Sequence, residues 1–164
     1  MRVLITGMSG TGKSSVLAGL ALRGWETVDT DYDAWKISNT DGDLVWDEAR
    51  MDRWLAQART ATNLAVGGCV PNQGRFHDRF DVIVLLTAPL DVMLERVAYR
   101  TTNPYGKSEE ERSEIRANTA LVEPLLRSTA NIVIDTYRTT VDDIVDRLTT
   151  MALRSTREAC APER

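Results

Sequence analysis

The sequence ITGMSGTGKSS, residues 5–15, lies between a short apolar run and a segment with helical periodicity. It contains the pattern GxxxxGK[ST], whose glycines let several backbone N–H groups converge on the oxygens of a phosphate group. A helix that begins at the end of such a loop points the positive end of its dipole at the same place. The stretch therefore predicts a strand, a phosphate-binding loop and a helix, in that order.

The side chains at the end of this loop suit a nucleotide with a metal ion. Lys13 can reach the β- and γ-phosphates, and the hydroxyl of Ser14 can bind Mg²⁺. The motifs DxxG and NKxD, both typical of GTPases, do not occur in the chain. We therefore predict that the loop binds ATP with Mg²⁺. The loop residues expected to contact the nucleotide are Gly7, Met8, Ser9, Gly10, Thr11, Gly12, Lys13, Ser14 and Ser15.

The composition fits a single globular domain with a core of its own. The chain has 164 residues and a formal net charge of −4, and no block of lysines and arginines suggests a nucleic-acid partner. Cys69 and Cys160 lie far apart without CxxC spacing, which favours a reducing compartment. No apolar run reaches the ~18 residues of a membrane span. We therefore expect a cytoplasmic protein, a monomer or a homodimer, without a membrane partner.

Apolar runs alternate with helical patterns along the chain, which indicates an α/β fold with a parallel sheet and helices on both faces. The expected strands are residues 3–6, 25–31, 64–70, 81–88 and 131–135. The expected helices begin near residues 13, 44, 89, 108 and 140, and the second runs to residue 62. Residues 34–43 are expected to form a helical turn and a loop, and residues 71–80 a polar loop.

Two local signals refine this three-layer fold. Ser108 and Glu111 are spaced as a capping box at the start of a helix, and Pro124 should kink or split that helix. The alternation of strands and helices is not interrupted by a linker or a repeat. We therefore expect one domain over residues 1–154 and a flexible tail over residues 155–164.

Two acids follow the second expected strand, in the sequence VDTD at residues 28–31. A conventional Walker B strand ends in Asp, but the strand expected at 64–70 carries none, so a metal site needs another acid beside Ser14. Asp29 and Asp31 are expected to share one face at the carboxyl end of their strand, where open α/β sheets bind ligands. One carboxylate can serve the metal, and the other can orient an acceptor hydroxyl or take its proton.

The sequences GMSGTGKS, VDTD and VGGC resemble motifs of the group of small kinases that contains the shikimate, gluconate and adenylate kinases. The resemblance covers most of the chain in the order of its elements, and the first motif is the specific one. It implies a P-loop kinase that transfers the γ-phosphoryl group of Mg·ATP to a hydroxyl of a small polar metabolite. It also implies that Asp29 supports the metal and that Asp31 meets the acceptor and acts in catalysis with Lys13.

The same resemblance implies positions for the acceptor and for a lid. Gly67 and Gly68 would bring bare backbone close to the acceptor, and Arg50 and Arg53 would grip it. A mobile lid over about residues 100–112 would close over the site and exclude water.

Further side chains can serve the nucleotide or the acceptor. Arg96 and Arg100 lie one helical turn apart, and the resemblance to these kinases implies that they clamp the transferring phosphoryl group as catalytic charges. Arg100 or Arg138 would stack on the adenine. Asn72 and Arg75, in a polar stretch after VGGC, can hydrogen-bond an acceptor.

The chain also departs from the patterns of these kinases. Cys69 stands in place of a third glycine, the lid sequence Arg-Pro-Leu-Leu is absent, and no Gly-x-Pro-Arg follows the third strand. A kinase is thus implied, whereas shikimate as its acceptor is not. A nucleoside monophosphate kinase and a non-catalytic nucleotide-binding or regulatory ATPase remain as alternatives.

Overall fold

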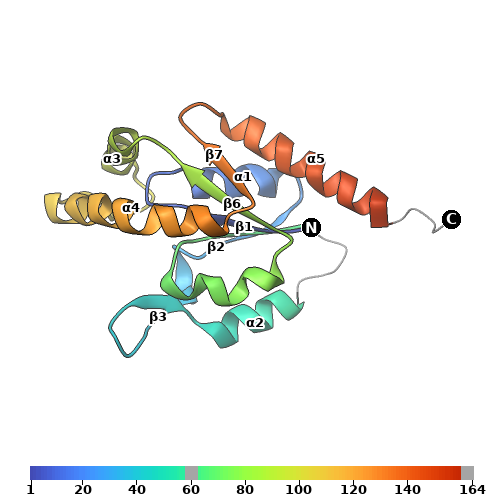
Figure 1. Ribbon diagram of the computed structural model, residues 1–164, viewed down its shortest axis with the longest axis horizontal. Helices are drawn as coiled ribbons and strands as arrows, with labels where there is room; N and C mark the ends of the chain where they lie inside the picture. Colours follow the sequence, from blue (N-terminus) through green and yellow to red (C-terminus); the bar gives the residue numbers. More distant parts are fainter. Residues whose placement is uncertain (58–62, 160–164) are drawn as a thin grey trace.

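The computed structural model describes residues 1–57 and 63–159, which form three layers (Figure 1). A five-stranded sheet lies in the middle, in the order β2-β5-β1-β6-β7, and all its neighbouring strands are parallel. Its strands are β1 (Arg2–Thr6), β2 (Glu26–Asp29), β5 (Leu64–Gly67), β6 (Val82–Thr87) and β7 (Ile132–Asp135). The predicted α/β class and the predicted five-stranded parallel sheet are confirmed.

Helices cover both faces of the sheet (Figure 1). They are α1 (Lys13–Leu22), α2 (Glu48–Gln57), α3 (Leu90–Tyr99), α4 (Glu109–Thr129) and α5 (Val141–Ala159). Helices α1 and α5 pack against each other on one face, and α2 lies on the opposite face. In the part of the chain that the structure describes, no helix is long and apolar enough to cross a membrane.

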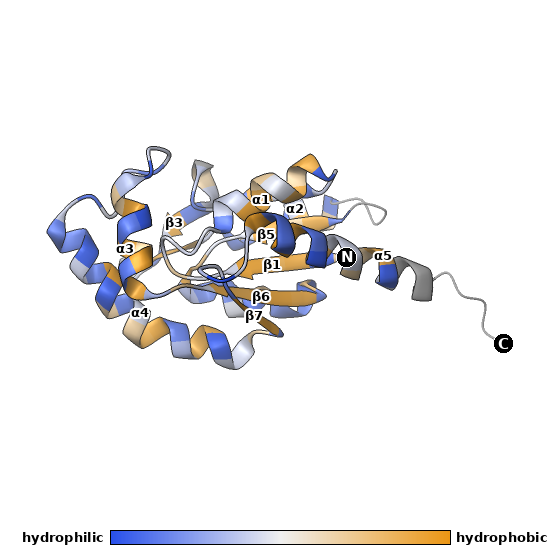
Figure 2. Cartoon of the chain, turned by 90° about the horizontal axis from the view of Figure 1, so that it is seen from above, coloured by the Kyte–Doolittle hydropathy of each residue, from blue (hydrophilic) through white to orange (hydrophobic). Residues whose placement is uncertain are grey.

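Strand β1 shows how the sequence produces this layering. Its residues Val3, Leu4 and Ile5 are completely buried. Because side chains alternate along a strand, Val3 and Ile5 join the core beneath α1 and α5, whereas Leu4 joins the core on the face of α2. A strand that is covered on both faces therefore reads as a continuous apolar run, and Figure 2 shows the hydrophobic strands between helices of mixed hydropathy.

The parallel strands bring chemically useful groups to one edge of the sheet. Their carboxyl ends meet there, so the glycine-rich loop after β1 lies near Asp29 at the end of β2 and near Thr136 after β7. In open α/β sheets this edge is where ligands bind.

The segment between β2 and α2 differs from the prediction. A helical turn is present as the short 3₁₀ helix η1 (Asp33–Trp35), but an antiparallel hairpin of β3 (Lys36–Ser38) and β4 (Leu44–Trp46) replaces the expected loop and start of a helix. The Asn39 side chain holds the turn of the hairpin, since its Oδ1 accepts bonds from the backbone N–H groups of Asp41 and Asp43. Such local side-chain bonds compete with helix formation, which the apolar periodicity did not reveal.

Helix α2 begins at residue 48 and not near residue 44 as predicted. The carboxylate of Asp47 accepts a hydrogen bond of 3.0 Å from the backbone N–H of Arg50, which is the bond of an N-cap. Residues 58–62 of the expected helix lie outside the described residues.

Three further expectations have different outcomes. The capping box of Ser108 and Glu111 is present, but α4 runs through Pro124 without being split. The polar stretch after β5 is the 3₁₀ helix η2 (Pro71–Arg79), which begins at a proline, whose fixed φ suits a first turn. Residues 155–159, expected in a tail, continue helix α5, and residues 160–164 lie outside the described residues.

Candidate active site

The glycine-rich loop has a backbone that requires glycine. Gly7 has φ 147° and Gly10 has φ 87°, values that residues with a Cβ rarely adopt. A Cβ on Gly7 would lie 2.4 Å from the carbonyl oxygen of Leu86, and one on Gly10 would lie 2.5 Å from that of Met93. The loop is therefore wedged between the end of β6 and helix α3, which fixes its path.

Lys13 points back into this loop. Its side chain is only 7% exposed. The ammonium group donates to the carbonyl oxygens of Gly7 at 2.8 Å and Met8 at 3.4 Å, and lies 3.6 Å from Oδ2 of Asp31. A buried ammonium ion with only carbonyl groups and one carboxylate around it is a strong attractor for a phosphate.

Ser14 and Asp29 form the second part of the site. The Ser14 hydroxyl donates to Oδ2 of Asp29 at 2.6 Å. Strand β2 ends at Asp29, so the expectation that Asp29 and Asp31 alternate along the strand is wrong. A turn brings them together instead, because the backbone N–H of Asp31 donates to Oδ1 of Asp29 at 3.0 Å.

These oxygens fit a magnesium ion. Within the described residues no group of three or more His, Cys, Asp or Glu side chains is placed to hold a metal. Mg²⁺ in nucleotide sites needs no such cluster, since one or two protein oxygens suffice and water and phosphate supply the rest. A hydroxyl and a carboxylate in contact, beside the phosphate-binding loop, meet that requirement.

Asp31 lies between two lysines. Besides Lys13, Lys36 from β3 donates to its Oδ1 at 2.6 Å. Burial raises the pKa of Asp31, but the charge of Lys13 and the hydrogen bond and charge of Lys36 outweigh it and hold that pKa below its usual value. Asp31 is therefore a carboxylate at neutral pH. Lys36 was missed in the sequence because the hairpin that carries it was not predicted.

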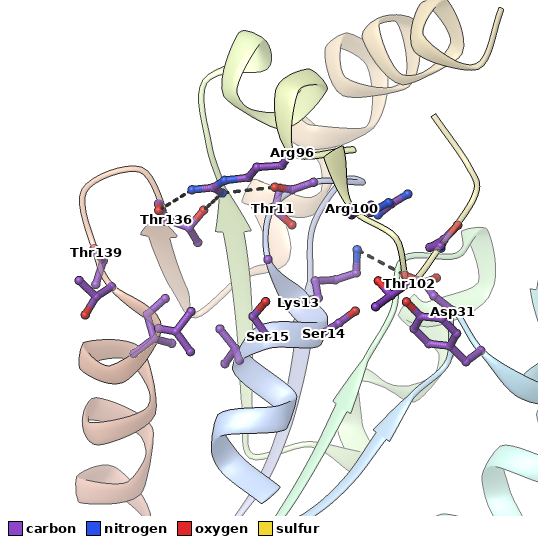
Figure 3. Close-up of a pocket in the computed structure, with 18 residues that line it drawn as sticks. Thr11, Lys13, Ser14, Ser15, Asp31, Arg96, Arg100, Thr102, Thr136 and Thr139 are labelled. Atoms are coloured by element: carbon purple, nitrogen blue, oxygen red, sulfur yellow. Dashed lines mark hydrogen bonds and ion pairs between the residues drawn. The ribbon is translucent and has the colours of Figure 1, made fainter. Parts of the chain in front are cut away.

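A cavity of about 510 Å³ joins these groups (Figure 3). Its walls come from the phosphate-binding loop, the turn after β2, the end of α3 with the segment that follows it, and the start of α5. The lining residues are Gly10, Thr11, Gly12, Lys13, Ser14, Ser15, Val16, Asp31, Tyr32, Arg96, Arg100, Thr102, Asn103, Thr136, Thr139, Thr140, Val141 and Ile144. Thr102 and Asn103 lie in the predicted lid but were not singled out, and Tyr32, Val16, Thr136 and the lining residues at the start of α5 were not predicted as site residues.

Arg96 and Arg100 both line the cavity, but they are engaged differently. The guanidinium of Arg96 donates to the hydroxyl oxygen of Thr136 at 2.8 Å and to the carbonyl oxygen of Thr136 at 3.0 Å. It also donates to the carbonyl oxygen of Gly10 at 3.3 Å. Figure 3 shows this guanidinium spanning from the phosphate-binding loop to the segment after β7. Arg100 donates once, to the carbonyl oxygen of Tyr105 at 2.8 Å, and its Nε has no partner among the described residues.

The segment at residues 100–108, predicted to form part of a lid, is a loop between α3 and α4 that is anchored at its far end. Lys107 donates to the carbonyl oxygens of Val97, Ala98 and Arg100 and so caps helix α3. Tyr105 donates to Glu114, and burial, followed by this carboxylate, raises the pKa of its phenol to about 12. The cavity side of the loop, in contrast, presents Arg100, Thr102 and Asn103.

Several predicted site residues lie elsewhere. Arg50 and Arg53 line a separate hollow of about 230 Å³, together with Trp35, Trp54 and Gln57. Arg50 lies 4.3 Å above the ring of Trp35 and donates to the carbonyl oxygen of Ala34. Arg138 is highly exposed, 3.6 Å from Asp135, and does not line the cavity.

The remaining predicted acceptor residues have partners within the fold. Asn72 accepts from the N–H of Trp46 and donates to the carbonyl oxygen of Trp46 and to Glu48, and Arg75 pairs with Glu48 at 3.3 Å.

The glycines after β5 also serve the fold. A Cβ on Gly68 would lie 2.1 Å from Oγ1 of Thr30, and one on Gly67 would lie 2.5 Å from Cδ1 of Leu17. These positions are thus small because neighbouring side chains pack against them, whatever an acceptor requires.

The sheet order, the glycine-rich loop between β1 and α1, and the buried lysine at its end define a P-loop protein of the small, single-sheet kind. A sequence profile described as an AAA domain matches residues 3–117, and the chain belongs to that family. The resemblance to small P-loop kinases drawn from the sequence is confirmed by the relatives of the chain.

A shikimate kinase of Francisella philomiragia is 25% identical over 168 residues, covering 94% of this chain and 96% of its own. Among solved structures, shikimate kinase from Acinetobacter baumannii in complex with shikimate has a TM-score of 0.61 and 25% identity, covering 94% of this chain and 93% of its own. A sugar kinase from Janibacter sp. HTCC2649, 20% identical with a TM-score of 0.55 and coverages of 91% and 92%, shares the fold. Together with the site, these relatives identify the chain as a phosphotransferase of the P-loop kinase type.

Proposed function

We propose that the protein transfers the γ-phosphoryl group of Mg·ATP to a hydroxyl group of a small polar metabolite. The observation that carries this proposal is the meeting of Lys13, Ser14 and Asp31 at one cavity, with Asp29 hydrogen-bonded to Ser14. Phosphoryl transfer needs little covalent chemistry from a protein, but it needs charged groups that neutralise the phosphate and side chains that position the two reactants.

The donor half consists of the phosphate-binding loop with Lys13. Lys13 would exchange the carbonyl oxygens of Gly7 and Met8 for phosphate oxygens, and Ser14 and Asp29 would hold Mg²⁺. The metal, when bound, neutralises charge on the phosphate oxygens. Thr139, Thr140, Val141 and Ile144, at the far end of the cavity, offer small apolar surfaces and hydroxyls to the nucleobase.

The acceptor half consists of Asp31 with the lid. Asp31 is ionised, so it would accept a hydrogen bond from the acceptor hydroxyl and orient its oxygen toward the γ-phosphorus. Arg100 is the lid cation best placed to stabilise charge on the transferring group, because it lines the cavity and its guanidinium donates one hydrogen bond, to Tyr105, among the described residues. Arg96 is less suited to that role, since its guanidinium already makes three hydrogen bonds.

The acceptor is expected to be a small molecule with several hydroxyl groups. Relatives that are named for shikimate and for a sugar support this class. Shikimate itself is not singled out, because Cys69 stands at the third glycine and because Arg50 and Arg53 line a different hollow from Asp31.

The experiment is a screen for ADP release from Mg·ATP with purified protein. The panel contains shikimate, gluconate, common hexoses and nucleoside monophosphates, and Lys13→Ala and Asp31→Asn serve as inactive controls. Acceptor-dependent ADP release by the wild-type protein that both variants lose supports the proposal. Release with a nucleoside monophosphate alone would establish a nucleoside monophosphate kinase instead, and tight ATP binding without stimulation by any acceptor would favour a regulatory nucleotide-binding protein.

A further inference from the structure

The carboxylate of Asp31 is shared by two of the three lysines in the chain. Lys36 is 2.6 Å from Oδ1, and Lys13 is 3.6 Å from Oδ2. Among the arginines that the structure describes, none pairs with this carboxylate, and the third lysine, Lys107, caps helix α3.

Lys36 is held at this position by the hairpin. It is the first residue of β3 and pairs in register with Trp46 of β4, whose side chain is completely buried. The indole N–H of Trp46 donates at 2.8 Å to Oγ1 of Thr30, the residue between Asp29 and Asp31. The hairpin is therefore attached to the same turn that carries Asp31, which keeps the Lys36 ammonium group beside its carboxylate.

Without Lys36, Asp31 would compete with phosphate for Lys13. The Lys13 side chain is 7% exposed and that of Asp31 is 25% exposed, so their attraction is only partly screened by water. Lys13 must turn its ammonium group toward the β- and γ-phosphates when a nucleotide binds. A carboxylate 3.6 Å away that had no other cation would hold it back.

We propose that Lys36 is a positioning residue that engages Asp31 and so leaves Lys13 free to bind the nucleotide phosphates. This inference rests on the proposed function, since it assumes that the phosphate-binding loop receives ATP. It assigns the hairpin that carries Lys36 a task in the donor half of the site.

The test is isothermal titration of Mg·ATP into the protein at about pH 8. Lys36→Met should raise the Kd for Mg·ATP about tenfold, which is the effect expected from the loss of one partly buried ion pair. Lys36→Arg keeps the charge and should recover most of the affinity. The double variant Asp31→Asn/Lys36→Met removes the competing carboxylate as well and should bind Mg·ATP more tightly than Lys36→Met alone.

A matched control separates this competition from a general change of charge. Arg79→Met removes one positive charge from a surface ion pair with Asp52 and should leave the Kd for Mg·ATP unchanged. The inference is overturned if Lys36→Met binds like the wild type, if the double variant regains nothing, or if Arg79→Met is as weak as Lys36→Met. Failure of the proposed function looks different, because the wild-type protein itself would then fail to bind Mg·ATP or to phosphorylate any acceptor.

Discussion

The hydroxyl of Ser14, at the start of α1, donates to the carboxylate of Asp29, at the end of β2, over 2.6 Å. The two residues are 15 positions apart in the chain, and strand β5 lies between β2, which ends at Asp29, and β1, which precedes the loop that leads to Ser14. The hydroxyl oxygen of Ser14 and the carboxylate oxygen of Asp29 are both hard ligands of the kind that Mg²⁺ prefers. Their contact implies that a metal ion would insert between groups that the fold has already brought together.

Replacement of Asp29 by Asn should therefore impair the binding of metal-bound nucleotide selectively. The variant keeps the shape of the side chain but loses its charge, so we expect the Kd for Mg·ATP to rise about tenfold. The Kd for ATP in excess EDTA should change by less than about twofold, because no metal takes part. Titrations with and without Mg²⁺ measure both values, and Asp41→Asn in the exposed hairpin turn is the control. Equal losses in the two buffers would place Asp29 outside the metal site.

Arg96 is predicted to act on the stability of the fold. Its three hydrogen bonds join the phosphate-binding loop to the segment after β7, so Arg96→Met should destabilise the fold by about 2 kcal/mol. Arg96→Lys should not restore stability, because a lysine cannot reproduce the planar fork. Urea denaturation measures the free energy of unfolding, and a Lys variant as stable as the wild type would show that the charge alone matters.

Arg100 is predicted to act on turnover more than on stability. It makes one hydrogen bond, to the carbonyl oxygen of Tyr105, and lines the cavity beside Lys13. If its guanidinium stabilises the transferring phosphoryl group, Arg100→Met should lower kcat by about 100-fold with a smaller effect on the Kd for Mg·ATP. Steady-state kinetics with the acceptor from the screen gives kcat, and titration gives the Kd. A loss confined to the Kd would assign Arg100 to the nucleobase instead.

The sequence predicts the central strands β1, β5 and β6 well because they are buried on both faces of the sheet. Continuous apolar runs such as Val3 to Ile5, and the motif that follows them, locate β1 and α1 without any tertiary information. The hairpin β3–β4 is not predicted from the sequence because its few apolar residues are spread over a polar stretch. Its order comes from burial of Trp46 and from bonds of Asn39 that no periodicity reveals.

In the candidate site, too, some residues can be predicted from the sequence and others cannot. Gly7, Lys13, Ser14 and Asp29 follow from a motif and from the rule that ligands bind at carboxyl ends of strands. Lys36 depends on the unpredicted hairpin. The sequence also cannot distinguish a small residue that makes room for a ligand from one that makes room for a neighbouring side chain, as at Gly68.

Gly68→Ala should therefore destabilise the protein even without any substrate. Its Cβ would lie 2.1 Å from Oγ1 of Thr30, which is already bonded to Gly67 and to Trp46. We expect a loss of about 1–3 kcal/mol in the free energy of unfolding, as for other overpacked sites. Gly74→Ala, where a Cβ would meet nothing within 4 Å, is the control and should be nearly neutral. If both variants unfold at the same denaturant concentration, packing against Thr30 is not what restricts Gly68.

His77, the only histidine in the chain, should make stability depend on pH. Its Nε2 is buried without a hydrogen-bond partner among the described residues, and this burial lowers the pKa of the imidazole below its usual 6.5. In the unfolded chain the imidazole of His77 is therefore protonated near pH 6.5, whereas in the folded protein it is protonated only at a lower pH. Stability contributed by the neutral imidazole is present above pH 6.5 and is lost as the pH falls through the folded pKa.

The measurement is urea denaturation of the wild type and of His77→Gln at several values between about pH 5 and pH 8. The difference in unfolding free energy between the two proteins should be constant above about pH 7. As the pH falls further, the wild type should lose stability relative to the variant. Carboxylates titrate in both proteins, so their effect cancels in this difference, unlike that of His77. Parallel curves over the whole range would mean that the buried nitrogen of His77 is protonated as easily in the folded protein as in the unfolded chain.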